Sequence, residues 1–247
     1  MEILYVALLF LILLGVVYCA RLLRALHAKI SKNSSEIHKL SLANKKRSMI
    51  AYRQTEAFIQ LTNLLDFKAA IPATRSWAAS PDLLLTISEI VKKNKPGLVV
   101  ELGSGVSTLV AAKSGARKIV SIDNSDEWGA KTVALLKEHK LSGVDVRIAP
   151  LRPYANGSDW YEVAAIRDLK NIDLLIIDGP PGSKNPEARY PALQQFKDKL
   201  SASAIVIIDD VHRDGERKLA EDFAKALPNH VLTVLDHEKG TAIIAPR

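Results

Sequence analysis

A glycine-rich segment, Glu101-Leu-Gly-Ser-Gly-Val-Ser-Thr108, follows an apolar run and precedes a helix-forming stretch. Two glycines in this segment let the backbone turn tightly and let a ligand approach it without a Cβ in the way. The free N–H groups at the start of the following helix can bind a carboxylate. We therefore expect a ligand here, in contact with Glu101, Gly103, Ser104, Gly105 and Ser107. The alternative is a strand–helix turn that uses glycine for its geometry alone.

An acid ends the next apolar run, at the spacing expected for a contact with a ribose. Asp123 comes twenty residues after Gly103, and Asn124 follows it. A carboxylate at this place can bridge the two hydroxyl groups of a ribose. A dinucleotide-binding motif would have a third glycine at position 108, where this chain has Thr108. The ligand is therefore nucleotide-like, and the pattern disfavours NAD or FAD.

Three further acids follow two other apolar runs. Asp178 comes after residues 172–177, and Asp209 and Asp210 come after residues 204–208. Neighbouring parallel strands lie about 4.8 Å apart, so these carboxylates should converge at the edge of the sheet where ligands bind. Three oxygen donors can hold Mg²⁺ or another divalent cation, which would orient an acceptor oxygen and lower its pKa. Alternatively, one acid caps a helix and another contacts only cofactor or solvent.

Basic side chains near the same edge offer a proton acceptor or a clamp for a substrate. They are Lys184, Arg189, His212 and Arg213. For each residue alone, a solvated or structural role is the simpler interpretation. His212 has the chemistry best suited to accept a proton near neutral pH. We take Asp178 and His212 as the candidate catalytic residues.

The elements that must position these side chains follow from the hydrophobic pattern. Short apolar runs alternate with helical stretches, and runs such as Leu174-Leu-Ile-Ile177 indicate strands buried on both faces of a parallel sheet. A short polar turn joins the last two runs, which must therefore pair antiparallel. The pattern predicts a doubly wound α/β fold with a Rossmann-like sheet of seven strands. The strands are expected at residues 98–102, 118–122, 144–148, 172–177, 204–208, 231–235 and 241–245. The helices are expected at residues 83–93, 107–114, 127–139, 159–169, 188–199 and 216–226.

Several of these segments, in this order, resemble the bacterial class I methyltransferases with a "methyltransferase 24" type domain. They include Glu101 to Thr108, Ala149-Pro-Leu151, Trp160-Tyr161, Asp178-Gly-Pro-Pro-Gly182, Ala188-Arg-Tyr-Pro-Ala192 and Asp209-Asp210. The resemblance covers about residues 76–246. It implies S-adenosylmethionine as cofactor, bound by the glycine turn, with Asp123 on its ribose and Ala149, Pro150 and Leu151 near its adenine.

A more distant similarity is to the catechol O-methyltransferases, whose metal ligands are an acid after the fourth strand and an Asp-Asn pair after the fifth. Asp178, Asp209 and Asp210 match these ligands in placement, with Asp210 in place of the asparagine. That family also has a lysine three residues after its first metal acid, where this chain has Pro181. The similarity therefore implies a metal site but does not identify the base.

The first twenty residues predict a single membrane-spanning helix. Residues 3–20 are uncharged and apolar except for two tyrosine hydroxyls, and eighteen helical residues span about 27 Å, the thickness of a hydrocarbon core. A cleaved signal peptide is the alternative, but no basic residue precedes the run and its cleavage site is poor. Nine basic residues and one acid between positions 21 and 53 place the rest of the chain in the cytoplasm.

We divide the chain into an anchor (residues 1–20), a basic helical stalk (21–72) and a methyltransferase domain (73–247). The stalk has a weak heptad pattern interrupted by Asn33 and Asn44, which allows at most a weak homo-oligomer. Its basic residues explain the pI of 9.4 without nucleic acid binding, for which no aromatic-rich motif is present.

These observations predict a membrane-anchored enzyme that methylates an oxygen of a small-molecule, glycan or lipid-linked acceptor with S-adenosylmethionine. Two other functions remain open at this point. One is an NAD-dependent oxidoreductase on a similar sheet. The other is a membrane scaffold that keeps the cofactor site without catalysis.

Overall fold

The computed structural model describes residues 1–155, 157–182 and 185–247, and the chain forms two units, Met1–Tyr52 and Arg53–Arg247. One unbroken helix, α1 (Glu2–Leu64), makes up the first unit and extends into the second. Among the described residues it is the one helix long and apolar enough to cross a membrane, and its apolar window is not buried. The stalk predicted for residues 21–72 is helical up to Leu64.

The second unit contains a seven-stranded sheet in the described part of the chain, with the strand order β3-β2-β1-β6-β7-β9-β8. Six strands run in one direction, and β9 runs against its neighbours β7 and β8. This arrangement confirms the predicted fold class. The strands are β1 (Val99–Leu102), β2 (Ile119–Asp123), β3 (Val144–Ile148), β6 (Ile172–Ile177), β7 (Leu200–Asp209), β8 (His230–Leu235) and β9 (Thr241–Pro246).

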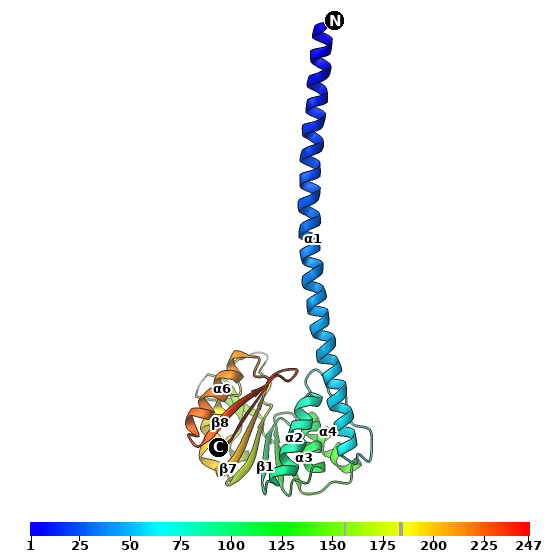
Figure 1. Ribbon diagram of the computed structural model, residues 1–247. Coiled ribbons are helices and arrows are strands. Elements are labelled where there is room, and N and C mark those ends of the chain that lie inside the picture. The colour runs from blue at the N-terminus through cyan, green and yellow to red at the C-terminus, as the bar shows by residue number, and fades with distance from the viewer. Residues whose placement is uncertain (156, 183–184) are drawn as a thin grey trace. The chain divides into compact units, whose positions relative to one another are not determined.

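Helices cover both faces of the sheet (Figure 1). On one face the end of α1, α2 and α3 pack against alternate strand residues such as Leu174 and Ile176. On the other face α5 and α6 pack against the residues between them, such as Leu175 and Ile177. The helices are α2 (Pro81–Asn94), α3 (Val106–Lys113), α4 (Asp126–Glu138), α5 (Pro191–Phe196) and α6 (Asp214–Ala226). Burial on both faces explains the continuous apolar runs of the central strands, residues 174–177 of β6 and 204–208 of β7.

The helix predicted for residues 159–169 is wrong. Residues of this region form a small antiparallel hairpin of β4 (Leu151–Pro153) and β5 (Asp159–Tyr161), followed by one 3₁₀ turn, η1 (Val163–Ile166). Trp160 and Tyr161 have aromatic side chains that favour strands, and both are buried in the core below the sheet edge. The burial of both rings against the central strands stabilises the hairpin more than the weak helical pattern of residues 162–169 would stabilise a helix.

The predicted helix at residues 188–199 is shorter than expected and ends in a second 3₁₀ turn, η2 (Lys197–Lys199). Pro191 is the first residue of α5, a position where a helix does not need the missing N–H. Residues 188–190 precede the helix and bring Arg189 to the carboxyl edge of the sheet, as described below.

The last turns of α1 are part of the second unit. The amide of Gln54 donates to Asp82 at the start of α2 (2.6 Å), and the backbone N–H of Glu238 donates to the same carboxylate oxygen (2.9 Å). Leu61 and Leu65 are buried against α2 and α3. This part of the unit is therefore held by both polar and apolar contacts.

Candidate functional site

The glycine turn after β1 is a close backbone contact between two strand ends. Gly103 has a φ of +94°, and a Cβ at this position would lie 3.2 Å from the backbone carbon and oxygen of Asp178. A side chain here would be strained and crowded at once, so glycine is required. At Gly105, by contrast, a Cβ would meet no atom of the described residues within 4 Å. Space for a ligand is therefore present at Gly105.

Glu101 lies near the end of β1 and is 1% exposed. Only one of its two carboxylate oxygens accepts hydrogen bonds from the described residues. Its Oε2 accepts hydrogen bonds from the hydroxyl groups of Thr108 and Ser121, the latter at 2.8 Å. Its Oε1 has no partner among the described residues. Burial raises the pKa of Glu101, although hydroxyl groups, Ser107 foremost, act against this rise. An unpaired buried carboxylate oxygen is costly, which points to a donor supplied by a ligand.

Thr108 explains why a third glycine is absent. Its hydroxyl donates to Glu101 and accepts the N–H of Gly105 at 3.0 Å. The threonine side chain therefore fixes the conformation of the turn, which a glycine at this position could not do. This geometry agrees with the sequence argument against a dinucleotide motif.

Asp123 ends β2 and holds the glycine turn. One carboxylate oxygen accepts from the backbone N–H and the hydroxyl of Ser104 (3.0 and 2.7 Å), and the other accepts from the N–H of Ser125 (2.9 Å). The second oxygen, which accepts one hydrogen bond, keeps a lone pair for a further donor. Asn124 is half-buried beside it. Ala149 donates its N–H to the carbonyl of Asp123 (2.7 Å), which brings Pro150 and Leu151 to the same edge.

Tyr161 is a site residue that the sequence analysis did not assign. It is 1% exposed, and a Cβ on Gly179 would collide with its hydroxyl and lie 3.0 Å from the backbone nitrogen of Gly103. The hydroxyl has no hydrogen-bond partner in the described part of the chain. Burial, assisted by the charge of Asp123, raises the pKa of Tyr161 well above its ordinary value. The signal in the sequence was its place in the pair Trp160-Tyr161, one of the segments that resemble the methyltransferases.

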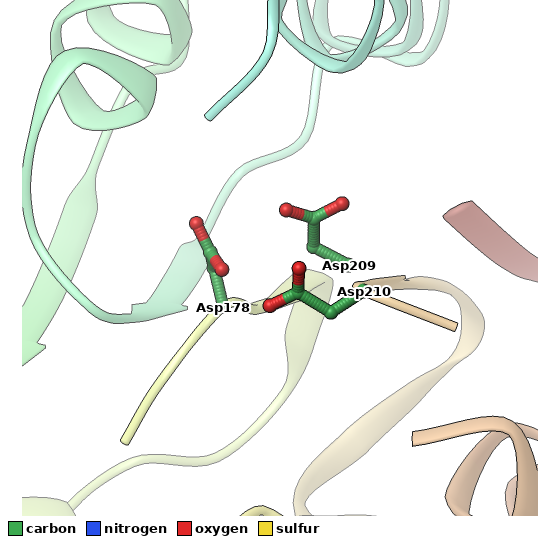
Figure 2. A group of neighbouring side chains, drawn as sticks. All are labelled: Asp178, Asp209 and Asp210. Atoms are coloured by element: carbon green, nitrogen blue, oxygen red, sulfur yellow. The ribbon is translucent and has the colours of Figure 1, made fainter. Parts of the chain in front are cut away.

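The three acids Asp178, Asp209 and Asp210 do converge, as the sequence predicts. One carboxylate oxygen of each lies within 4.8 Å of the others, and Figure 2 shows the three carboxyl groups gathered at the ends of β6 and β7. Asp210 has a φ of +64°, an uncommon conformation for a residue with a side chain. We call these three residues, together with the buried Glu216 of α6, the acidic cluster.

Burial and the charges of neighbouring carboxylates raise the pKa of two acids of this cluster, Asp178 and Asp209. Burial raises the pKa of Asp178 to about 6, against the attraction of the Arg189 guanidinium. Burial, then the charges of Asp178 and Asp210, raises the pKa of Asp209 to about 8. Carboxyl groups whose pKa lies near neutral pH are suited to proton transfer.

In the described part of the chain, three cations surround the acidic cluster. Arg189 is 4% exposed, and its Nη2 lies 2.9 Å from Oδ2 of Asp210 and 3.2 Å from Oδ1 of Asp178. Arg213 lies 3.1 Å from the same oxygen of Asp210, and Lys239 lies 3.8 Å from Asp209. Lys184 lies outside the described residues. Of the other three basic side chains named from the sequence, which the structure describes, Arg189 is the most deeply buried.

His212 lies two residues after Asp210 but does not enter the acidic cluster. It is exposed, and its ring lies against Gly240 in the turn between β8 and β9. No hydrogen bond or ion pair joins it to the acidic cluster within the described ranges. Asp178 is therefore the better placed of the two candidate catalytic residues.

Comparison with known families bears directly on this site. Residues 100–211, from β1 to the residue after Asp210, match the model of a methyltransferase domain family. The chain carries a methyltransferase domain. The match spans the glycine turn, Asp123 and the three aspartates, and it confirms the predicted class I methyltransferase domain. A comparison with curated proteins finds no match.

Solved methyltransferase structures have the same fold. An O-methyltransferase from Bacillus cereus, solved in complex with SAH, has a TM-score of 0.55 at 16% identity, over 79% of this chain and 91% of its own. A methyltransferase from Geobacter sulfurreducens has a TM-score of 0.54 at 14% identity, over 78% and 88%. TomG from Streptomyces achromogenes, an O-methyltransferase in complex with SAM, has a TM-score of 0.53 at 13% identity, over 78% and 88%. At these identities the likeness establishes the fold of the methyltransferase domain.

Proposed function

We propose that this chain transfers a methyl group from S-adenosylmethionine to an oxygen of its acceptor. The observation that carries the proposal is the pairing of an open space at Gly105 with a buried, unpartnered oxygen of Glu101. A zwitterionic methionine group suits this pair, because the N–H groups that begin α3 can bind its carboxylate and Glu101 can accept from its ammonium. The bound cofactors of the O-methyltransferase TomG and the Bacillus cereus enzyme support the same assignment.

The other cofactor contacts follow the order of the strands. Asp123 and Asn124 are assigned to the ribose, and Pro150 and Leu151, next to Asp123 through Ala149, to the adenine. Ser104 and Ser107 are assigned to the cofactor at the glycine turn. Asp178, which follows β6, is assigned to the cofactor as well, because its backbone lies against Gly103. S-adenosylmethionine supplies, when bound, a methyl group activated by the positive sulfur.

The chain's own contribution to the reaction is positioning and proton removal. The acceptor oxygen attacks the methyl carbon in line, the carbon–sulfur bond breaks, and the sulfur keeps the electron pair. The acceptor must also lose its proton, and we assign Asp178 as the group that receives it. Its raised pKa of about 6 suits a base that works near neutral pH.

We further propose that α1 anchors the enzyme in a membrane, with the methyltransferase domain in the cytoplasm. The apolar start of α1 and the nine basic residues after it support this orientation. An enzyme held at a membrane meets acceptors that partition there, so the acceptor class is a small molecule, a glycan or a lipid-linked compound. A weak homo-oligomer through the stalk is part of the same proposal.

Calorimetric titration of the full-length protein in detergent micelles with adenosylhomocysteine and with NAD tests the cofactor. We expect saturable binding of adenosylhomocysteine and none of NAD. In Gly105→Ala the new methyl group fills the ligand space without touching other residues, so binding should be lost while thermal unfolding stays unchanged. Gly15→Ala adds the same methyl group in the apolar part of α1 and should bind normally. Tight NAD binding without adenosylhomocysteine binding would contradict the proposal.

A further inference from the structure

The acidic cluster has the residues for a divalent cation, and the similarity to catechol O-methyltransferases implies one. We infer instead that the guanidinium of Arg189 is the resident cation of this cluster and that the chain binds no divalent metal there. The inference also gives the proposed methyl transfer a metal-independent character, a consequence that rests on the proposed function.

The position of one nitrogen carries the inference. Nη2 of Arg189 lies between Asp178 and Asp210, within hydrogen-bond distance of a carboxylate oxygen of each. A bridging metal ion would need to stand at this place, about 2.0–2.6 Å from each oxygen for Mg²⁺ or Ca²⁺. The nitrogen and the ion cannot occupy it together. The residues present therefore do not fit a metal site.

Backbone contacts keep this guanidinium from leaving. Its Nε donates to the carbonyl of Pro180 (3.2 Å), its Nη1 to the carbonyl of Asp209 (3.3 Å) and its Nη2 to the carbonyl of Asp178 (2.8 Å). If Arg189 swung toward solvent, these three carbonyl groups would lose the hydrogen bonds that it donates, which disfavours the movement. The side chain is therefore a built-in part of the edge and not a mobile surface arginine.

The charges of the described residues lead to the same conclusion. Four carboxyl groups, those of Asp178, Asp209, Asp210 and Glu216, face three cations, Arg189, Arg213 and Lys239. A divalent ion added to this set would turn a near balance into an excess of positive charge in a buried place. If Arg189 is removed, four acids face two cations, which is the deficit that a divalent ion fills.

The inference widens the range of acceptors that the site can take. A metal centre selects acceptors with two neighbouring oxygens, because both can bind the ion at once. A fixed guanidinium makes no such demand. An acceptor with a single hydroxyl or carboxyl oxygen can then be methylated as well as a catechol.

Titration of the full-length protein in detergent micelles with Mn²⁺, followed by its paramagnetic resonance signal, tests the inference. Wild type should show no saturable binding below about 1 mM, with or without adenosylhomocysteine. Arg189→Ala should gain affinity by a factor on the order of ten or more, and Mn²⁺ should raise its lowered Tm. Arg167→Met, which removes an exposed arginine at the end of η1, should behave like wild type.

Stoichiometric Mn²⁺ binding by wild type that disappears in Asp210→Asn would overturn the inference, and so would a folded Arg189→Ala that gains no affinity. If Arg189→Ala does not fold, the wild-type titration alone decides. Failure of adenosylhomocysteine to bind, with the Mn²⁺ results as expected, would remove the proposed function and leave the assignment of Arg189 intact.

Discussion

Ser104 donates both its backbone N–H and its hydroxyl to a single carboxylate oxygen of Asp123, at 3.0 and 2.7 Å. The two residues belong to different strand ends, the turn after β1 and the last residue of β2. Because one oxygen takes both bonds, the position of the glycine turn depends on the charge at position 123. The hydrogen bonds between Ser104 and Asp123 therefore position both the turn proposed to bind the methionine group and the carboxylate proposed to bind the ribose.

Asp123→Ala should weaken adenosylhomocysteine binding about 10- to 100-fold, because it removes charge-assisted bonds to the ribose and to the turn. Ser104→Ala keeps the backbone bond and should weaken binding about fivefold. Calorimetry on both single variants and the double variant checks the coupling. The losses should be less than additive, since both changes release the same turn. Unchanged affinity in Asp123→Ala would remove this residue from the cofactor site.

Tyr161→Phe should stabilise the ligand-free protein by about 1 kcal/mol, because it deletes a buried hydroxyl without a partner. Gly179→Ala should destabilise it by about 1–3 kcal/mol, since the new Cβ collides with that hydroxyl. The double variant should recover part of this loss. Denaturant unfolding gives the three free energies. Equal destabilisation by Gly179→Ala in the presence and absence of the hydroxyl would show that Tyr161 is not the obstacle.

His237 should make the protein less stable in mild acid. Burial lowers its pKa from the ordinary 6.5, and its ring nitrogens face the hydroxyls of Thr241 and Thr86 (2.9 and 3.4 Å). The unfolded chain then binds more protons than the folded one, so the free energy of unfolding falls as pH drops through 6.5.

Denaturant unfolding from pH 7.5 to 5 measures this loss, and His237→Gln should lack it. The comparison with the variant is needed because the raised pKa values of Asp178 and Asp209 act in the opposite sense. They stabilise the protein as pH falls. Identical pH dependence in wild type and variant would exclude His237 as the cause.

Fusions of reporter domains to the C-terminus test the proposed anchor. A fluorescent protein that matures in the cytoplasm should be active, and an alkaline phosphatase that requires export should be inactive. Sodium carbonate extraction should leave the chain in the membrane fraction. Replacing Leu11 and Leu14 in the apolar run by arginine should release it. Active phosphatase fusions or cleavage near Ala20 would support the signal-peptide interpretation instead.

Much of the fold could be predicted because buried parallel strands leave a strong local signal. Leu174 to Ile177 is apolar at every position, and helices cover both faces of the sheet at this strand. The convergence of Asp178 with Asp209 also followed, since it needs only the ends of two adjacent parallel strands. These inferences use strand order and spacing alone.

The rest depended on contacts between distant segments. The pair Trp160 and Tyr161 was predicted to lie at the start of a helix, because nothing in the neighbouring sequence shows that both rings are buried in the core. Arg189 was one basic residue among several. Its role requires knowing that the short stretch before α5 crosses the ends of β6 and β7. The available clue was the group of three acids at one sheet edge, which need cations close to them.

The cations around the acidic cluster come from distant parts of the chain. They therefore also determine when, during synthesis, the cluster can form. The glycine turn and Asp123 lie in the first half of the chain and can find each other early. The acidic cluster needs Lys239, in the β8–β9 turn, which also donates to the carbonyl of Ala78 (3.0 Å). The acceptor side of the site is therefore finished only when the ribosome has nearly reached the C-terminus. A nascent or truncated chain would hold a cofactor pocket before it could hold a working catalytic edge.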